Sequence, residues 1–417
     1  MPIEISLVLA THNRREVVVQ SLQNIPRDDL KSEAVEVIVV DNQSTDGTVD
    51  VIRNLADVLI PLRSNLGSCG KALGVDHARG KFVVFLDDDS IPKPGSLSRM
   101  VERFGENPRL GAAGFTVHLP NGDREGAALP GVFVGCGVGF RADALRAVGG
   151  LDRTFFMQAE EYDLCFRLAS AGWDADVFDD LHVVHLKTDK ARRSERTTYY
   201  DVRNNLRVLG RYVPRPHYRA MREDVIERYR FLSENADHGE AFDRGIADGK
   251  RLAWSERRTH RRFRLTPEAF EKFFKWKALE ARMRRLRSTG VRRVLLADLG
   301  KHILGFHRAA AATGLQIAAI ADDGFARAGR TYRGIEILTV QEAIIRSFDA
   351  IVVSNLASVH AARTRYRLQA LGVGPAHDWY GERTGNAENE GDAGMDSPAP
   401  ITATDDTHAA IGAFPTL

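Results

Sequence analysis

Short runs of β-branched and other apolar residues alternate with helical stretches over the first 190 or so residues, and this alternation constrains the fold more than any other feature. The run at 35–40 is apolar on both faces, as a buried parallel strand requires. The pattern predicts a mostly parallel sheet covered by helices. The predicted strands are 3–10, 35–40, 58–62 and 81–86, and the predicted helices are 14–24, 48–55 and 68–78.

The rest of the chain falls into three parts. Residues 190–293 read as helix throughout and carry roughly twice as many basic as acidic residues. Residues 291–373 return to strand–helix alternation, which predicts a second, smaller Rossmann-like domain. The last residues contain few large apolar side chains and predict a disordered acidic tail. We therefore expect a catalytic α/β domain at 1–210, a basic helical segment at 211–289, a Rossmann-like domain at 290–380 and the tail at 381–417.

Composition excludes several classes of protein. The formal net charge is +2, so the chain as a whole has no strong attraction to nucleic acid. No apolar run approaches the roughly 18 residues of a membrane span, and Glu4 stands where a signal peptide needs positive charge. Three widely spaced cysteines predict neither a disulfide framework nor a zinc site. We expect a cytoplasmic protein.

Polar residues follow three of the predicted strands. Thr11-His12-Asn13 follows the first, the loop 41–47 the second, and Asp87-Asp88-Asp89 the fourth. The carboxyl ends of parallel strands converge at one edge of the sheet, where ligands bind. Two carboxylates one residue apart suit a divalent cation that bridges phosphate oxygens, so the pattern predicts a nucleoside diphosphate site. The loop 41–47 is equally consistent with a helix-capping turn.

A second acidic cluster lies downstream, where Glu160, Glu161 and Asp163 open a predicted helix. The helix dipole favours anions in the first turn, so an acidic helix start explains this cluster when it is taken alone.

The ordered motifs resemble the family 2 glycosyltransferases of the GT-A fold, and in particular bacterial rhamnosyl- and galactofuranosyltransferases. The resemblance covers residues 3–210. It rests on LVLATHNR, VIVVDNQSTDGT, NLGSCGKALGVDHARG, FLDDDSIP, GFRADALRAVGGLDRTFF, EEYDLCFRLASAGW and VVHL, in this order.

The resemblance implies a set of site residues. Asp41 would contact the nucleotide base, and the other residues of the nucleotide-sugar site would be Thr11, Asn13, Asn42, Ser44, Asn65, Gly70, Asp87 and Asp88. Asp89 would be a direct ligand of Mn²⁺ or Mg²⁺, with Asp87 and His185 completing the metal site. The usual family pattern Glu-Asp-x-Asp reads Glu160-Glu161-Tyr162-Asp163 here, which puts Glu161 in the place of the catalytic base. Asp163 stays as a rival for that role.

The predicted function is inverting transfer of a sugar from a nucleoside-diphosphate donor to a hydroxyl of a glycan or glycolipid acceptor. A sugar-phosphate nucleotidyltransferase is one alternative, although ATHNRREV lacks the glycine-rich phosphate loop that those enzymes usually carry. A non-catalytic nucleotide-sugar-binding scaffold is another, and the intact Asp87, Asp89, Glu161 and His185 argue against it.

A basic amphipathic helix is predicted from Thr266 onward, with Pro267 in its first turn. Such a helix can lie on an anionic membrane surface, which would add peripheral contact with the inner face of the membrane. It can also pack on its own protein with a solvated basic face. In the last α/β domain, the turn 298–305 contains glycines but no G-x-G-x-x-G pattern, so the sequence gives only weak support for a dinucleotide site there and assigns no activity to this domain.

Overall fold

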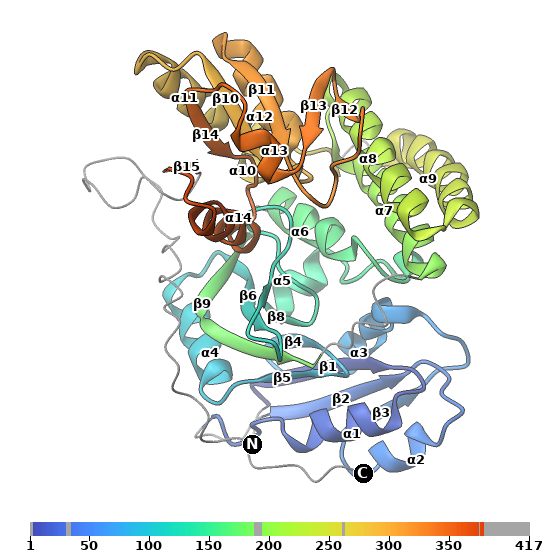
Figure 1. The fold of residues 1–417 in the computed structure, drawn as a ribbon. Helices are drawn as coiled ribbons and strands as arrows, with labels where there is room; N and C mark the ends of the chain where they lie inside the picture. The colour runs from blue at the N-terminus through green and yellow to red at the C-terminus, as the bar shows by residue number, and fades with distance from the viewer. Residues whose placement is uncertain (1–2, 31–34, 187–193, 261–262, 375, 379–417) are drawn as a thin grey trace.

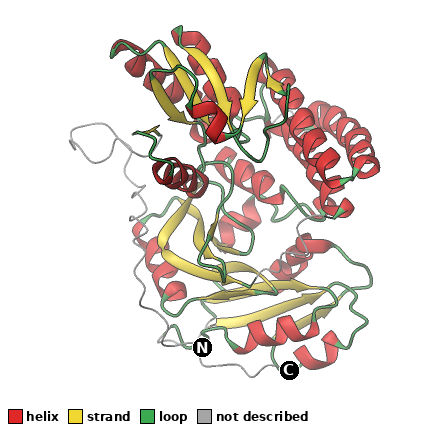
Figure 2. Ribbon diagram, in the orientation of Figure 1, coloured by secondary structure: helices red, strands yellow, loops and turns green. Residues whose placement is uncertain are grey.

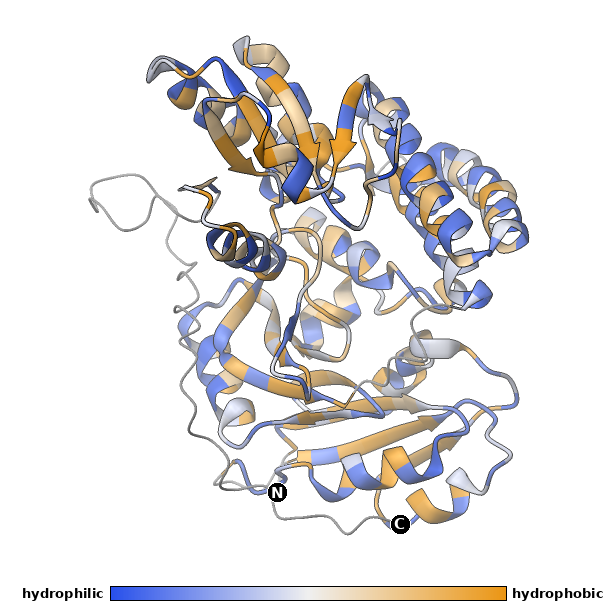
Figure 3. Ribbon diagram, in the orientation of Figure 1, coloured by the Kyte–Doolittle hydropathy of each residue, from blue (hydrophilic) through white to orange (hydrophobic). Residues whose placement is uncertain are grey.

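The computed structural model describes residues 3–30, 35–186, 194–260, 263–374 and 376–378 (Figure 1). Two sheets are joined by a helical segment, and helices cover both faces of the larger sheet (Figure 2). The strands of both sheets are largely hydrophobic (Figure 3). The tail predicted at 381–417 lies outside the described residues.

The larger sheet has the order β3-β2-β1-β4-β8-β6-β9-β5, with β7 paired to β6. Strands β1 to β4 are parallel, which confirms the prediction for this half, whereas β8 pairs antiparallel with both β4 and β6. The whole is a mixed α/β sheet of the GT-A type. Its strands are β1 (Ile5–Thr11), β2 (Val35–Asp41), β3 (Val58–Pro61), β4 (Phe82–Asp87), β5 (Ser90–Pro92), β6 (Leu110–His118), β7 (Arg124–Glu125), β8 (Gly137–Arg141) and β9 (Asp174–His185).

Alternate residues of each buried strand enter separate cores on the two faces of the sheet. Val8 and Ile38 belong to one core, and their neighbours Leu7 and Val37 belong to the other. Gly74 lets one helix approach closely, since a Cβ there would lie 2.4 Å from a methyl of Val8. The helices of this domain are α1 (Arg15–Gln23), α2 (Thr48–Ile52), α3 (Lys71–His77), α4 (Ser96–Glu106), α5 (Ala142–Ala147) and α6 (Glu160–Ser170), with 3₁₀ turns at Gly67–Gly70 and Arg153–Phe155.

The strand register brings the predicted site loops together. Thr11 at the end of β1 pairs with Asp41 at the end of β2, and Ala10 pairs with Asp87 at the end of β4. The three polar loops therefore leave the sheet side by side at one edge.

The basic segment is helical, as predicted, and its helices are α7 (Glu195–Tyr212), α8 (Arg215–Ala236), α9 (Gly239–Thr259), α10 (Pro267–Phe274) and α11 (Trp276–Ser288). Helices α7 and α9 pack closely, since a Cβ on Gly249 would lie 2.9 Å from a methyl of Leu206. Residue 210 lies inside α7, so the predicted boundary there does not coincide with a break in the chain. The division into domains stays a prediction.

The amphipathic helix begins as predicted, because the Thr266 side chain accepts a hydrogen bond from the backbone of Ala269. It is then interrupted at Lys275, whose φ is 54°. Phe273 of α10 is buried in a core of the catalytic domain, and Met283 of α11 is buried against the second sheet. The largest apolar side chains of this segment are thus covered by the protein itself. Membrane contact stays a prediction without support from this apolar face.

The second sheet has the order β12-β13-β11-β10-β14-β15, and its central strands β11, β10 and β14 are parallel, as the strand–helix alternation predicts. Its strands are β10 (Arg293–Ala297), β11 (Gln316–Ala321), β12 (Thr331–Tyr332), β13 (Ile335–Leu338), β14 (Ala350–Val353) and β15 (Ala376–His377), and its helices are α12 (Ile303–Thr313), α13 (Val340–Ile344) and α14 (Ser358–Ala370). Among the described residues, no helix is long and apolar enough to span a membrane.

Candidate active site

The three aspartates after β4 are each neutralised by a basic side chain. The Arg14 guanidinium lies 2.8 Å from both Asp88 Oδ1 and Asp89 Oδ2. The buried Lys71 ammonium lies 2.5 Å from Asp87 Oδ1 and donates a hydrogen bond to the carbonyl of Gly135. Like charges repel at such short separations unless cations offset them, and these two side chains supply that compensation.

The three aspartates have different surroundings. Asp88 points inward and accepts a hydrogen bond of 2.7 Å from Thr11 Oγ1, so Thr11 ties β1 to the end of β4. Burial raises the pKa of Asp88 to about 6, although the Arg14 charge opposes this rise. Asp87 is the most open of the three, with 38% of its side chain exposed. It is therefore the aspartate that a ligand at the sheet edge reaches most easily.

His185 joins Asp89 from the end of β9. Its Nε2 lies 3.1 Å from Asp89 Oδ1, and its Nδ1 lies 3.1 Å from Glu125 Oε2. Burial disfavours the imidazolium, but Asp89, Cys136 and Glu125 outweigh burial and raise the pKa of His185 to about 12. Burial likewise opposes ionisation of Asp89, while His185 and Arg14 hold its pKa at about 2. The sequence-predicted metal residues Asp89 and His185 are thus in direct contact.

The residues present fit a divalent cation. One ligand atom each from Asp87, Cys136 and His185 lies within 4.8 Å of the other two. Asp89 Oδ1 is buried beside them, 3.1 Å from His185 Nε2. Carboxylate oxygens and an imidazole suit Mn²⁺, and a thiolate would add a softer ligand.

The loop after β2 leaves one carboxylate oxygen without a partner. Asp41 Oδ2 accepts a hydrogen bond of 2.9 Å from the backbone of Ser44, whereas the buried Oδ1 has no hydrogen-bond partner among the described residues. Asn13, whose φ is 51°, supports this loop, because its backbone donates to Ser44 Oγ and its side-chain oxygen accepts from the backbone of Thr45. Asp41 is therefore prepared to accept a hydrogen bond from a ligand.

Three other predicted contacts shape the backbone. The Asn42 side chain holds residues 66 and 67 through two hydrogen bonds, and Asn65 Oδ1 accepts from the backbone of Gly67. A Cβ on Gly70 would lie 2.9 Å from Asn42 Oδ1, so a larger residue would push this amide away. The structure gives Asn42, Asn65 and Gly70 a role in holding the loop beside the nucleotide edge.

Glu160 and Glu161 open α6 in a crowded acidic environment. Ser68 donates a hydrogen bond to Glu160 Oε1, and Glu160 Oε2 is buried without a hydrogen-bond partner among the described residues. Burial, together with the neighbouring Glu160 charge, raises the pKa of Glu161 to about 8, and burial also raises the pKa of Glu160. Lys71 favours the ionised form of Glu161 and Asp87 opposes it, so the base candidate lies within electrostatic reach of the aspartate cluster.

The Asp163 carboxylate is paired with basic side chains of α6 and α7. Its Oδ2 accepts two hydrogen bonds from the Arg167 guanidinium, and its Oδ1 accepts hydrogen bonds of 2.6 Å from both Arg211 and the Tyr212 hydroxyl. The residue is completely buried. These four bonds occupy the lone pairs that a base would need. Asp163 is therefore an internal ion-pair partner of Arg167 and Arg211, and its role as a base stays a prediction.

The backbone before α6 is fixed by α7. Phe156, Gln158 and Ala159 all have positive φ angles, which non-glycine residues rarely adopt. The Asn204 amide donates to the carbonyls of 155, 157 and 158 and holds this segment in place.

Sequence reasoning missed four polar contributors, namely Arg14, Lys71, Glu125 and Cys136. Lys71 could have been suspected, because a lysine among the small and apolar residues that start α3 needs a buried anion. Cys136 had no signal beyond its position between two glycines before β8.

Three adjacent strand-end loops rich in carboxylates leave a sheet of this order, an arrangement consistent with the GT-A fold. Residues 6–131 match the family described as Glycosyl transferase family 2. This part of the chain is therefore similar to the family 2 glycosyltransferases.

Curated relatives agree with this assignment over a limited length. The chain is 34% identical over 110 residues to the GalNAc(5)-diNAcBac-PP-undecaprenol beta-1,3-glucosyltransferase of Campylobacter jejuni, a match that covers 25% of this chain and 35% of the relative. It is 32% identical over 104 residues to the succinoglycan biosynthesis protein ExoO of Rhizobium meliloti, covering 24% and 29%. The chain thus spans about a third of the length of the curated relatives it matches.

Among solved structures, a mannosyltransferase from Pyrobaculum calidifontis in complex with GDP-Man and Mn²⁺ matches with a TM-score of 0.42 at 18% identity, covering 75% of this chain and 87% of that one.

Proposed function

We propose that this protein transfers a sugar from a nucleoside-diphosphate donor to a hydroxyl group of a glycan or glycolipid acceptor, with inversion at the anomeric carbon. The observation that carries the proposal is the position of the buried Lys71 ammonium, which pairs with Asp87 of one acidic cluster and lies within electrostatic reach of Glu160 and Glu161 of the other. The donor diphosphate and the acceptor hydroxyl must be held close together for the reaction, so the groups that bind them must lie close together as well. The family assignment of residues 6–131 supports the same reaction class.

The nucleotide would bind at the edge formed by β1, β2 and β4. The free Oδ1 of Asp41 would accept a hydrogen bond from the base, and Asn13 and Ser44 would keep the loop in place for it. Thr11 would act through Asp88, which it holds by a hydrogen bond, more than through direct contact.

Asp87, Asp89 and His185 would hold a divalent cation, with Cys136 close enough to join them. A cation there supplies positive charge to the diphosphate as it leaves. The pairing of Asp87 with Lys71 and of Asp89 with Arg14 would hold these carboxylates in place for the cation.

Glu161 would take the proton of the acceptor hydroxyl. Its raised pKa suits a base near neutral pH, since catalytic groups work best when their pKa lies near the operating pH. Asp163 would instead position α6 through its bonds to Arg167 and Arg211. Its carboxylate has no lone pair left for an acceptor proton.

The test is calorimetric titration of the full chain with a panel of nucleoside diphosphates, with Mn²⁺ and with EDTA. We expect at least one diphosphate to bind in a metal-dependent manner and Asp89→Ala to lose this binding. Asp76→Ala is the matched control, because Asp76 is an exposed carboxylate on α3, and it should bind like the wild type. Equal affinity of Asp89→Ala and wild type, or no binding of any diphosphate to the wild type, would contradict the proposal.

A further inference from the structure

A large cavity lies behind α6, away from the aspartate cluster. Its volume is about 730 Å³, and its walls come from α6, α7, α8 and the loop 299–305 of the second sheet. Tyr162, the residue after Glu161, lines it. The cavity therefore lies beside the first turn of α6, and part of its wall belongs to the Rossmann-like domain.

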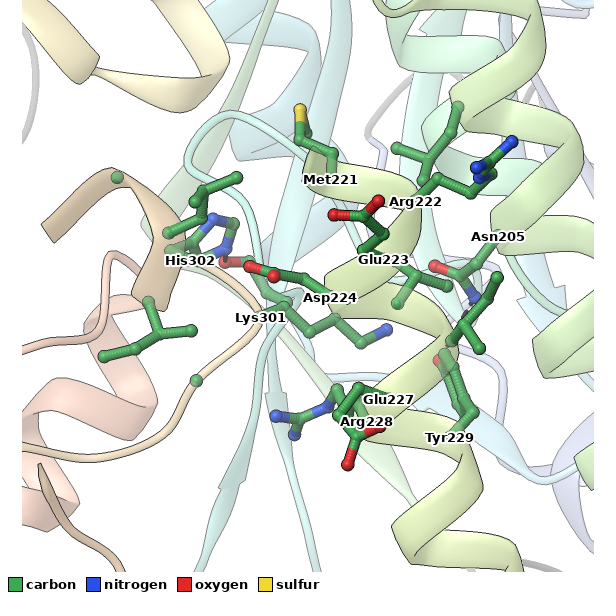
Figure 4. Close-up of a pocket in the computed structure, with 18 of the residues that line it drawn as sticks. Asn205, Met221, Arg222, Glu223, Asp224, Glu227, Arg228, Tyr229, Lys301 and His302 are labelled. Carbon is green, nitrogen blue, oxygen red and sulfur yellow. Dashed lines mark hydrogen bonds between the residues drawn. The ribbon is translucent and has the colours of Figure 1, made fainter. Parts of the chain in front are cut away.

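Lys301 extends from that domain into the cavity. Figure 4 shows its side chain reaching from the loop before α12 toward Asn205 and Tyr229. The residue is exposed to the cavity space, although protein surrounds it on all sides. Its ammonium lies 5.7 Å from the ring centre of Tyr162 and 5.8 Å from that of Tyr229. Among the described residues, none forms an ion pair or hydrogen bond with it.

The Lys301 ammonium faces the open space of the cavity without an ionic partner among the described residues, and the protein walls around it disfavour its charge. Burial lowers the pKa of Lys301, while Asp201 and Glu161 only partly oppose that effect. Asp201 is occupied by the Tyr229 hydroxyl, which donates a hydrogen bond of 3.3 Å to it. An anion in the cavity would satisfy the ammonium.

The other charged walls favour an anion as well. Of the acidic side chains there, Asp224 is already paired with Arg333 and accepts a hydrogen bond from the Tyr332 hydroxyl. In contrast, Arg222 has a buried Nε with no hydrogen-bond partner among the described residues. Glu223 is paired with Arg219, and the wall carries Arg228 and Arg330 beside the remaining carboxylate of Glu227, so basic side chains predominate in the lining.

The remaining wall is apolar and includes Leu209, Trp276, Ile303 and Leu304. A simple inorganic anion would leave this surface in contact with water. An anion joined to an apolar group would cover it, and apolar area removed from water contributes about 25 cal/mol per Å².

We propose that this cavity is an acceptor subsite, completed by Lys301 of the second domain, for a phosphate ester that carries an apolar group. This inference rests on the proposed function, because it makes the ligand the acceptor of that reaction. The phosphate would lie against Lys301, the apolar group against Trp276 and α12, and the hydroxyl to be glycosylated toward Glu161.

The test uses hexyl phosphate as the probe, titrated calorimetrically into the full chain without nucleotide. We expect saturable binding to the wild type, and a loss of ten- to a hundredfold in affinity in Lys301→Met, as for a hydrogen bond to a charged group. Lys277→Met is the matched control, because Lys277 is exposed on α11 outside the cavity, and it should bind like the wild type. The thermal midpoint of Lys301→Met should rise, because an unpaired ammonium is replaced by an apolar chain.

Two further probes separate the parts of the ligand. Hexyl glucoside, which lacks the charge, and inorganic phosphate, which lacks the apolar group, should each bind at least tenfold more weakly than hexyl phosphate. Equal binding of hexyl phosphate to Lys301→Met and wild type, or a lower thermal midpoint in this variant with unchanged affinity, would overturn the proposal. Equal binding of inorganic phosphate would assign the site to free phosphate and overturn the acceptor role.

Metal-dependent nucleoside diphosphate binding, measured on the same samples, keeps the two proposals apart. If the diphosphate binds and hexyl phosphate does not, the acceptor subsite is wrong and the proposed function stands. If no diphosphate binds in a metal-dependent manner, the proposed function is wrong, and the acceptor role that rests on it is wrong as well.

Discussion

Replacing Glu161 by glutamine should make the protein more stable at alkaline pH while removing its activity. In the folded chain Glu161 is half-buried next to Glu160, and burial together with this neighbour raises its pKa to about 8. Between its ordinary pKa of 4.5 and about 8, the folded protein keeps a proton that the unfolded chain has lost. The free energy of unfolding therefore falls as the pH rises through this window.

The size of the effect follows from the same pKa values. Each tenfold change in acid dissociation is worth about 1.4 kcal/mol, so ionising Glu161 in the folded protein opposes folding by up to about 5 kcal/mol. Glu160 shares this repulsion, and the glutamine amide must find hydrogen bonds of its own. We expect Glu161→Gln to gain about 2 kcal/mol over the wild type between pH 5 and pH 8.5. Turnover should fall by roughly 10² or more, as for loss of a general base.

The assay is urea denaturation followed by circular dichroism at pH 5 and pH 8.5, for the wild type, Glu161→Gln and Asp163→Asn. Asp163→Asn is the matched control, because Asp163 is a buried carboxylate of the same helix that is paired with Arg167 and Arg211. It should lose about 3–5 kcal/mol at both pH values, since it leaves guanidinium groups unpaired. A Glu161→Gln variant whose stability relative to the wild type does not increase with pH would refute the reasoning.

Two other perturbations test the site and the domain arrangement. Gly135→Ala should lower turnover at least tenfold without changing nucleotide affinity, because a Cβ there would lie 3.0 Å from Glu161 Oε1. Steady-state rates and calorimetry measure the two quantities, and Gly105→Ala is the neutral control, because a Cβ at Gly105 would have no atom within 4 Å. Unchanged turnover in Gly135→Ala would count against Glu161 as the base. A chain ending at residue 287 should aggregate, because Leu279 and Met283 lose the second sheet that covers them; a monodisperse, folded product in size-exclusion chromatography would contradict this packing.

The sequence was a sound guide wherever a local pattern determines the structure. Strand β2 is apolar on both faces because it is central in the sheet, and the carboxyl ends of parallel strands must converge, so the neighbourhood of Asp41 and Asp87 followed from strand order alone. Thr266 and Pro267 marked the start of α10 because capping is a local interaction.

Features that depend on contacts between distant segments could not be predicted in this way. The aspartates are contacted from three different parts of the chain, by Arg14, Lys71 and His185. The local sequence around each of these residues does not indicate which carboxylate it contacts. The left-handed residue Lys275 divides a helix that the periodicity treats as continuous, because α10 and α11 pack on different cores.

The choice between Glu161 and Asp163 was open in the sequence for the same reason. Both carboxylates lie in the first turn of α6, but helix geometry turns them to different sides. Only the position of Arg211 on α7 makes one of them an internal ion-pair partner.

The ion pairs of Arg211 have a consequence for anyone who exchanges parts between related enzymes. This guanidinium contacts Asp163 of α6 and Glu256 of α9 at the same time. A chimera joined at residue 210 would take Asp163 from one parent and its two distant partners from the other. Recombination that respects the three-dimensional network must inherit Asp163, Arg211 and Glu256 as one unit, so the natural crossover point lies after α9.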